Sequence, residues 1–185
     1  MAAPPEVTIK NLSGKFTMNK SLSGDVDAIL TLQGMSWLMR KTISITNVTL
    51  YITQQDIDGV THIDIKQIAT AGIEVSPENR VLNWTERAQD DKIFGKVVGR
   101  SRWTKLEELD VTDAEDKKWL TEGWDEDGEK VEARVVSESG GWNVVALWGF
   151  SLVNGTRHHT RKLVVRNTKG KVIRDRLVYD YVAED

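Results

Sequence analysis

The stretch SLSGDVDAILTLQGMSWLMRK, from Ser21 to Lys41, is the clearest helical segment in a chain whose other segments read as strands. Apolar residues recur at helical spacing between Val26 and Gln33, after Ser23 as the expected N-cap. Gly34 can adopt a left-handed conformation and ends this helix. A second short apolar turn then runs to Arg40 and Lys41. The pattern predicts a helix, a glycine and a second helix, which together form a lid over a sheet.

Segments with the alternation and β-branched composition of strands lie on both sides of this lid. Before it, Val7 to Met18 predicts an entering strand that is broken at Gly14. After it, the predicted strands are TISITNVTLYIT from Thr42, the run Val60 to Ala71, RVLNWTER from Arg80 and FGKVVGRSRWTKL from Phe94. A turn is expected between them at Ser76 to Asn79.

The C-terminal third predicts a meander of five more strands. These are WLTEGW from Trp119, EKVEARVVSE from Glu129, WNVVALWGFSLV from Trp142, TRHHTRKLVVRN from Thr156 and KVIRDRLVYDYV from Lys171. Glycine-containing turns separate them, as in an up-and-down antiparallel sheet, and closure into a barrel removes exposed edges. We expect an all-β, up-and-down antiparallel barrel of about ten strands with a helix-turn-helix lid between the first two. A barrel of this width leaves room for a ligand cavity.

The length of 185 residues fits a single domain over residues 1–185. Within it, residues 1–6 are expected to form a Pro-containing tail, and the helical lid spans 21–41. The acidic stretch 106–118 is expected to be an inserted solvated loop, although Thr112 and Asp113 could cap a short helix.

Composition limits the partners and the chemistry. The formal net charge is −3 with both signs interspersed, which argues against nucleic acid as a partner. The start of the chain does not resemble a signal peptide and no window is apolar enough for a membrane span, so we expect a cytoplasmic protein. There are no cysteines, and adjacent histidines on a strand point to opposite faces, so we expect no metal site and no cofactor.

Aromatic and basic side chains are the candidates for ligand binding in the predicted cavity. They are Trp37 in the lid with Trp84, Trp103 and Trp148 on strands, and Arg40 and Arg87, which offer planar donor groups to a carbonyl or an anion. Core packing and surface charge are the alternative interpretations. The strand from Trp142 to Val153 is apolar on both faces, so either the acidic insertion or a partner subunit in a homodimer is expected to cover its outer face.

The last hairpin carries the densest polar cluster. If residues 168–170 form a three-residue loop, His159 pairs with Tyr179, Arg161 with Leu177 and Val165 with Ile173. A two-residue turn would place His158 and Lys162 there instead. In the preferred register His159, Arg161 and Tyr179 are candidate catalytic residues, and Tyr181 is a candidate ligand contact on the same face. A solvated strand face is the alternative.

Three features together resemble the intracellular fatty-acid-binding-protein branch of the calycins. They are LSGKF at Leu12 to Phe16, the lid from Ser23 to Lys41, and the final strand RLVYDYV from Arg176. The resemblance implies a ten-stranded barrel with a helical portal and a partly hydrated cavity for lipids. The Arg-x-Tyr pair with which that family holds a carboxylate is absent, because Leu177 and Tyr179 stand two residues before the tyrosines Tyr179 and Tyr181.

The chain is also longer than is usual in that family and contains seven tryptophans, which suggests a larger or more aromatic ligand. In its general sequence character it is similar to calycin-like pericyclases and cyclases of fungal biosynthetic pathways. This resemblance implies binding of a small hydrophobic, aromatic or polycyclic molecule, and a cyclisation or isomerisation without a cofactor. An intracellular lipid carrier without catalysis and a protein-interaction module are the alternative functions, so enzymatic activity stays open at this point.

Overall fold

The computed structural model describes residues 1–70, 73–74 and 77–183. Its strands are β1 Gly14–Met18, β2 Val48–Ile57, β3 Val60–Ala69, β4 Ile73–Glu74, β5 Glu78–Val81, β6 Arg87–Asp91, β7 Gly95–Thr104, β8 Lys130–Ser137, β9 Trp142–Val153, β10 Thr156–Asn167 and β11 Val172–Val182. Its helices are α1 Val26–Leu32, α2 Trp37–Ile45, a 3-10 turn at Leu106–Glu108 and α3 Ala114–Thr121. No helix in these ranges is long and apolar enough to span a membrane.

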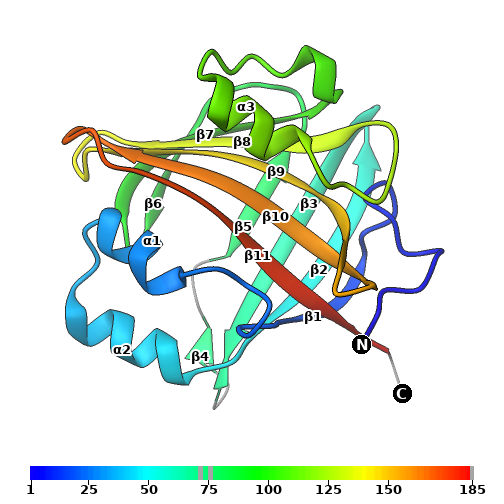
Figure 1. Ribbon diagram of the computed structural model, residues 1–185, viewed down its shortest axis with the longest axis horizontal. Helices are drawn as coiled ribbons and strands as arrows, with labels where there is room; N and C mark the ends of the chain where they lie inside the picture. Colours follow the sequence, from blue (N-terminus) through cyan, green and yellow to red (C-terminus); the bar gives the residue numbers. More distant parts are fainter. Residues whose placement is uncertain (71–72, 75–76, 184–185) are drawn as a thin grey trace.

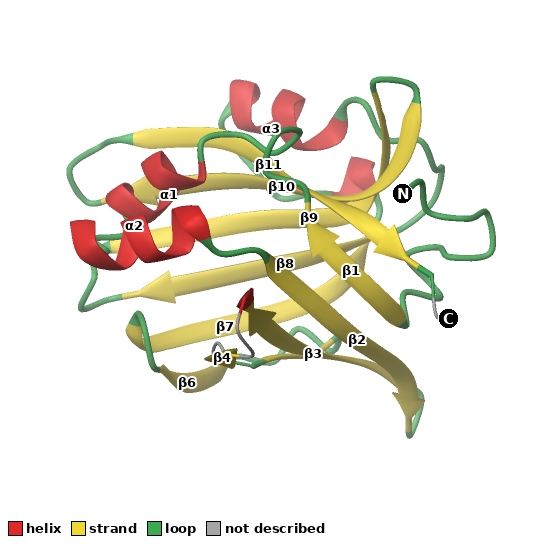
Figure 2. Cartoon of the chain, turned by 90° about the horizontal axis from the view of Figure 1, so that it is seen from below, coloured by secondary structure: helices red, strands yellow, loops and turns green. Residues whose placement is uncertain are grey.

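All the strands belong to one antiparallel sheet, with the order β4-β3-β2-β1-β11-β10-β9-β8-β7-β6 and with β5 also paired to β3. The sheet curls strongly, and the lid helices α1 and α2 lie across one end of it (Figures 1 and 2). Within the described residues no ladder joins β5 to β6 or β7. The Arg80 side chain of β5 nevertheless reaches β7, where its Nη1 lies 3.3 Å from the position that a Cβ on Gly99 would take. The all-β antiparallel fold with a helical lid is confirmed.

The lid differs from the prediction at both ends. Asp25, not Ser23, caps α1 by accepting a hydrogen bond from the Ala28 amide at 2.9 Å. The Ser23 hydroxyl instead accepts from the Val178 amide at 2.9 Å and so ties the root of the lid to β11. Gly34 has the expected positive φ of 82°.

The second helix is longer than predicted, because α2 continues to Ile45 and the predicted strand at Thr42 does not form. In a helix, the Thr42 hydroxyl can donate to the carbonyl of the preceding turn, and here it donates to Leu38 at 3.1 Å. The strand-like composition of this segment therefore belongs to a helix, and β2 begins only at Val48.

The acidic insertion is not a solvated loop, so that expectation was wrong. Asp113 caps α3 by accepting from the Asp116 amide at 2.9 Å. The predicted strand from Trp119 is also wrong, because α3 continues to Thr121. Leu120 is fully buried against Leu147 of β9 and Val164 of β10, and Figure 1 shows α3 lying over these strands. The chain's own insertion therefore covers the outer face of β9, which was one of the two predicted covers.

Several strand limits also move. The entering strand is short: β1 begins at Gly14, and an isolated bridge joins Thr8 to Asn11 before it. The predicted strand from Arg80 to Arg87 is wrong, because Trp84 has a positive φ of 61° between β5 and β6. The predicted turn at residues 76–79 is wrong over Glu78 and Asn79, which begin β5. Ser76, and the predicted strand end at Ala71, lie outside the described residues.

The N-terminal residues predicted as a tail pack on the barrel. The Ala3 amide donates to the Arg157 carbonyl at 2.8 Å, and the Tyr181 amide donates to the Met1 carbonyl at 3.2 Å. Ala3 is buried in the main hydrophobic cluster. The first residues thus close one end of the fold.

The register of the last hairpin is confirmed. His159 pairs with Tyr179, Arg161 with Leu177 and Val165 with Ile173. Gly170, with a φ of 80°, supplies the left-handed residue that the three-residue loop requires.

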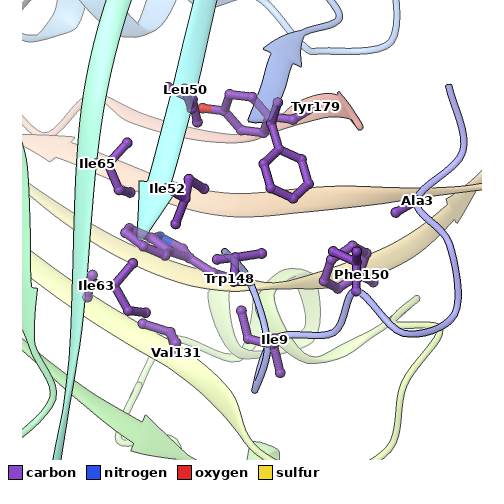
Figure 3. Close-up of a cluster of buried hydrophobic side chains, with 14 of the residues drawn as sticks. Ala3, Ile9, Leu50, Ile52, Ile63, Ile65, Val131, Trp148, Phe150 and Tyr179 are labelled. Carbon is purple, nitrogen blue, oxygen red and sulfur yellow. The ribbon is translucent and has the colours of Figure 1, made fainter. Parts of the chain in front are cut away.

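Two hydrophobic clusters occupy the two ends of the barrel. The larger one packs Phe16, Trp148, Phe150 and Tyr179 against isoleucines of β2 and β3 (Figure 3). The smaller one packs Ile29 and Leu32 of α1 against Trp142 and Val165, with Phe94 and Val97 at its margin. The space between the two clusters is the candidate site.

Candidate functional site

A cavity of about 630 Å³ lies between the main cluster and the lid. Its wall is mostly apolar on the lid side, with Ile29, Leu30, Met35, Met39 and Ile43 among the lining residues. Four residues line the cavity and also belong to the main cluster, which places them at its floor: Ala133, Ala146, Trp148 and Tyr179. Such a concave space, mostly apolar with a few polar groups, is typical of a small-molecule site.

The polar end of the cavity is built around Arg161. Its Nη1 donates to the Glu78 carboxylate at 2.9 Å, and its guanidinium carbon lies 3.8 Å from the centroid of the Trp148 ring. Arg80 holds the same carboxylate through Nε at 3.1 Å and Nη2 at 2.5 Å. Tyr179 completes this end, with its ring 5.3 Å from the Arg161 guanidinium carbon.

The charges of this cluster are set by their neighbours. Burial alone would raise the pKa of Glu78, but the Arg161 and Arg80 guanidiniums outweigh it and lower the pKa to about 2. Burial opposes the charge of Arg161, and Glu78 overcomes it and raises the Arg161 pKa. Burial also raises the pKa of Tyr179. At neutral pH the cluster therefore contains one carboxylate, two guanidiniums and a protonated phenol.

Part of Arg161 is unsatisfied. The side chain is 8% exposed, and its Nε and Nη2 are buried without a hydrogen-bond partner among the described residues. Buried donors of a charged group are costly to leave unpaired. Such donors are typical of a place where a bound molecule supplies the acceptor.

His159 does not line this cavity, although its register is as predicted. It is fully buried in the main cluster, where its ring stacks on Tyr179 at 5.4 Å and contacts Phe16 and Phe150. Its Nδ1 lies 3.1 Å from the Gly149 carbonyl. Burial, with the positive charge of Arg161, lowers its pKa to about 3, so the ring is neutral.

The predicted lid contacts lie outside the cavity lining. Trp37 is 63% exposed on the outer side of α2. Arg40 joins the two lid helices, because its Nε donates to Asp27 at 3.0 Å and its Nη1 donates to the Met35 carbonyl at 2.7 Å. The structure thus places Arg40 within the lid itself.

The remaining candidates divide between the cavity and the outside. Arg87 lines the cavity, as do Trp148, Arg161 and Tyr179. Trp84 instead lies against three arginines on the outer side, with Arg102 at 4.2 Å from its ring. The Trp103 indole donates to Thr61 at 3.2 Å and carries Lys10 over its ring, and Tyr181 packs edge-on against Phe16. These three are not cavity-lining residues.

Sequence reasoning missed Glu78 and Arg80. Glu78 binds Arg161 directly, and Arg80 is linked to Arg161 because both bind the Glu78 carboxylate. Both stand near Pro77 in a segment with turn composition, and β5 has only four residues. No local signal distinguishes such a strand from a turn, because its ladder among the described residues is with the distant strand β3. In the described part of the chain, no group of three His, Asp or Glu side chains is placed to hold a metal ion.

The fold is a lidded antiparallel β-barrel of the fatty-acid-binding-protein type. Solved structures with this fold include a variant of the REP1-NXSQ fatty acid transporter, at 13% identity with a TM-score of 0.54, covering 93% of this chain and 98% of that one. A Schistosoma mansoni fatty acid binding protein in complex with arachidonic acid is similar at 14% identity and a TM-score of 0.52, covering 92% and 96% of the two chains. These likenesses establish the fold alone.

Curated relatives are similar over nearly the whole chain. The "Probable pericyclase scpY" of Mollisia scopiformis is 34% identical over 185 residues, which covers 98% of this chain and 95% of the relative. The "Pericyclase pydY" of Acremonium sp is 35% identical over 187 residues, which covers 98% and 97%. No protein-family model matches the chain. The chain belongs to the family of these pericyclases.

Proposed function

We propose that the protein is a pericyclase that works without a cofactor. It would bind a flexible hydrophobic molecule in the barrel cavity and accelerate a ring closure in which bonds form and break within that one molecule. The observation that carries this proposal is the cavity of about 630 Å³ with one charged, hydrogen-bonding end. The relatives support the proposal, because a probable pericyclase is similar to this chain over 98% of its length.

Enclosure supplies one part of the acceleration. A flexible chain that folds into the reactive conformer loses conformational entropy, and a shaped cavity can meet that cost through binding. The lid and the strands opposite it offer apolar side chains such as Met35, Trp142 and Leu163 for this purpose.

Hydrogen bonding supplies the other part. A carbonyl conjugated to the reacting atoms gains negative charge in the transition state, and donors that are already oriented stabilise that charge. Arg161 and Tyr179 are the donors proposed for this role, since both line the cavity and Tyr179 keeps its proton because burial raises its pKa. His159, which stacks on Tyr179, acts in this proposal as a positioning residue for that ring.

A pericyclic ring closure leaves the mass of the substrate unchanged, and this gives the test. An organic extract of the native organism lacking this gene is incubated with the purified protein and followed by liquid chromatography and mass spectrometry. We expect one component to disappear while another of identical mass appears at a new retention time. Arg161→Gln should slow the conversion about 100-fold.

The matched control is Arg176→Gln, because Arg176 of β11 pairs with Lys162 of β10 and does not line the cavity. This variant should convert the extract at the rate of the unmodified protein. If the protein instead binds an extract component that is recovered unchanged, the carrier interpretation replaces the pericyclase proposal.

A further inference from the structure

We propose that Gly99 is a positioning residue: it leaves the space that Arg80 needs in order to hold Glu78, and Glu78 in turn fixes the orientation of Arg161. Gly99 belongs to β7, Glu78 and Arg80 to β5, and Arg161 to β10, so this series of contacts connects three strands. The consequence for the reaction rate rests on the proposed function, whereas the orientation of Arg161 can be measured without any reaction.

The first argument is the space above Gly99. A Cβ at this position would lie 3.3 Å from Arg80 Nη1, which is tighter than ordinary van der Waals contact. The next nearest atoms, the Arg134 carbonyl oxygen at 3.5 Å and Val135 Cγ2 at 3.8 Å, are at ordinary contact distances. Arg80 is therefore the neighbour that a side chain at position 99 would displace.

The second argument is that the backbone does not require a glycine here. Gly99 is not among the glycines with a positive φ, so its conformation is open to other residues. It lies inside the ten-residue strand β7, where a glycine weakens a strand and a β-branched residue stabilises it. A bend in the strand is the alternative reason for a glycine, and the two reasons predict different results.

The third argument is how the Glu78 carboxylate is held. Arg80 binds one of its oxygens, Oε1, through Nε at 3.1 Å and Nη2 at 2.5 Å. The other oxygen, Oε2, accepts from Arg161 Nη1 at 2.9 Å. Charge-assisted hydrogen bonds of this kind are the strong ones, and two arginines on two oxygens hold a carboxylate in one orientation.

The fourth argument is that Arg161 depends on this carboxylate. Its Nε and Nη2 have no partner among the described residues, whereas its Nη1 is bound to Glu78. The Trp148 ring lies 3.8 Å from the guanidinium carbon and fixes the distance from the ring, but stacking alone leaves a guanidinium free to turn. Glu78 therefore sets the direction in which the two free donors point. A displacement of about 1 Å at such a group can cost about 100-fold in rate.

The first experiment follows the Nε–H group of Arg161 by NMR in the full-length protein with isotope-labelled arginine. The signal is assigned by its absence from Arg161→Gln. We expect Gly99→Val, whose two Cγ atoms extend from the same Cβ, to shift this signal and to make its exchange with solvent about 10-fold faster. Gly99→Ala should cause a smaller change in the same direction.

Two further variants test the route through Arg80. Arg80→Lys keeps the charge and loses the planar fork, so it should reproduce the change in the Arg161 signal that Gly99→Val causes. The matched control is Ala88→Val, which adds the same side chain on β6 at an exposed position that does not line the cavity. It should leave the Arg161 signal and the reaction rate unchanged.

The second experiment separates position from stability. With the substrate component purified from the extract, Gly99→Val should lower kcat about 10-fold and change KM by less than about 3-fold. Its thermal unfolding temperature should not fall, because a β-branched residue suits the strand. The double variant Gly99→Val/Arg80→Ala should be no slower than Arg80→Ala alone, since the side chain that valine displaces is already absent.

Two results would overturn the proposal. One is an unchanged Arg161 signal in Gly99→Val, or in Gly99→Ala and Arg80→Lys if the valine variant does not fold, which would leave the bend as the reason for the glycine. The other is an additive loss of rate in the double variant. If the extract is not converted at all but the Arg161 signal moves as expected, the pericyclase proposal falls and the positioning of Arg161 by Gly99 stands.

Discussion

Arg161 and Trp148 are direct cross-strand partners on β10 and β9, and the guanidinium carbon of Arg161 lies 3.8 Å from the centroid of the Trp148 ring. The register of two long strands therefore sets a cation over an aromatic face at the floor of the cavity. Cation–π contacts that are removed from water are worth about 2 kcal/mol. The same pair joins the hydrophobic cluster to the polar end of the site, so stability and ligand recognition share these residues.

Replacing this aromatic face should affect stability first. Trp148 is 1% exposed, and we expect Trp148→Ala to lower the free energy of unfolding by about 3–5 kcal/mol because it opens a cavity and removes the surface under Arg161. Trp148→Phe keeps a smaller aromatic face and should lose less than half as much. Urea unfolding followed by circular dichroism measures both. Equal losses in the two variants would contradict a specific role for the aromatic face.

The buried histidine predicts sensitivity to acid. Burial lowers the pKa of His159 to about 3 from an ordinary value of 6.5, so below pH 6.5 the unfolded state takes up a proton that the folded state does not. Stability is therefore lost as the pH falls from 6.5 towards 3, by up to about 1.4 kcal/mol per pH unit. Between pH 6 and 5, His159→Phe should reduce this slope.

The control for this prediction is His62→Phe, since His62 on β3 is only partly buried and does not belong to the main cluster. It should leave the slope as it is in the unmodified protein. Urea unfolding at a series of pH values gives the slopes, and an unchanged slope in His159→Phe would contradict the buried neutral state. Glu78, with a pKa of about 2, adds its own loss below pH 4.5, which is why the comparison stops at pH 5.

The root of the lid depends on a close approach between Gly24 and Asp175. A Cβ at Gly24 would lie 1.4 Å from Asp175 Oδ1, and Asp175 Oδ2 accepts a hydrogen bond from the Asp25 amide at 2.7 Å. We expect Gly24→Ala to displace that carboxylate and to cost about 1–3 kcal/mol. In the Asp175→Ala background, the same substitution should cost much less. Additive losses in urea unfolding would show that the two residues are not coupled.

Arg40 predicts a local rather than a global effect. Its bonds to Asp27 and to the Met35 carbonyl join α1 to α2, so Arg40→Ala should loosen the lid while the sheet keeps its stability. We expect amides of residues 26–45 to exchange about 5-fold faster, as a loss of about 1 kcal/mol implies. Hydrogen-exchange mass spectrometry measures this, with the exposed Lys41→Ala as the matched control. Faster exchange throughout the sheet would contradict the assignment.

The parts of the fold that were predictable from the sequence have strong local signals. Gly170 in the last turn determined the hairpin register, and with it the pairing of His159 with Tyr179 and of Arg161 with Leu177. Alternation along β9 correctly separated Trp148 from Leu147, which α3 covers. In each case a local feature is sufficient: a glycine in the turn sets the register, and the two-residue alternation along the strand sets which face is buried.

The missed parts depend on distant contacts. Glu78 is a strand residue only because β3 pairs with it, and it binds Arg161, which stands 83 positions further along the chain. His159 was expected near the cavity, and the alternation along β10 correctly predicted that its side chain points into the barrel. Alternation does not say at which height along a barrel a residue stands, and at the height of His159 the interior is filled by Phe16 and Phe150.

The short strand β5 carries a consequence for how such proteins diversify. It supplies Glu78, Asn79 and Arg80 to the cavity, yet its described ladder is with β3 alone, so the remaining strands keep their pairing without it. Changes in this segment that keep a carboxylate partner for the buried Arg161 can therefore reshape the polar end of the site while the long strands keep their pairing. Natural variation in ligand preference, and laboratory libraries aimed at new ligands, should therefore concentrate on this segment before any of the long strands.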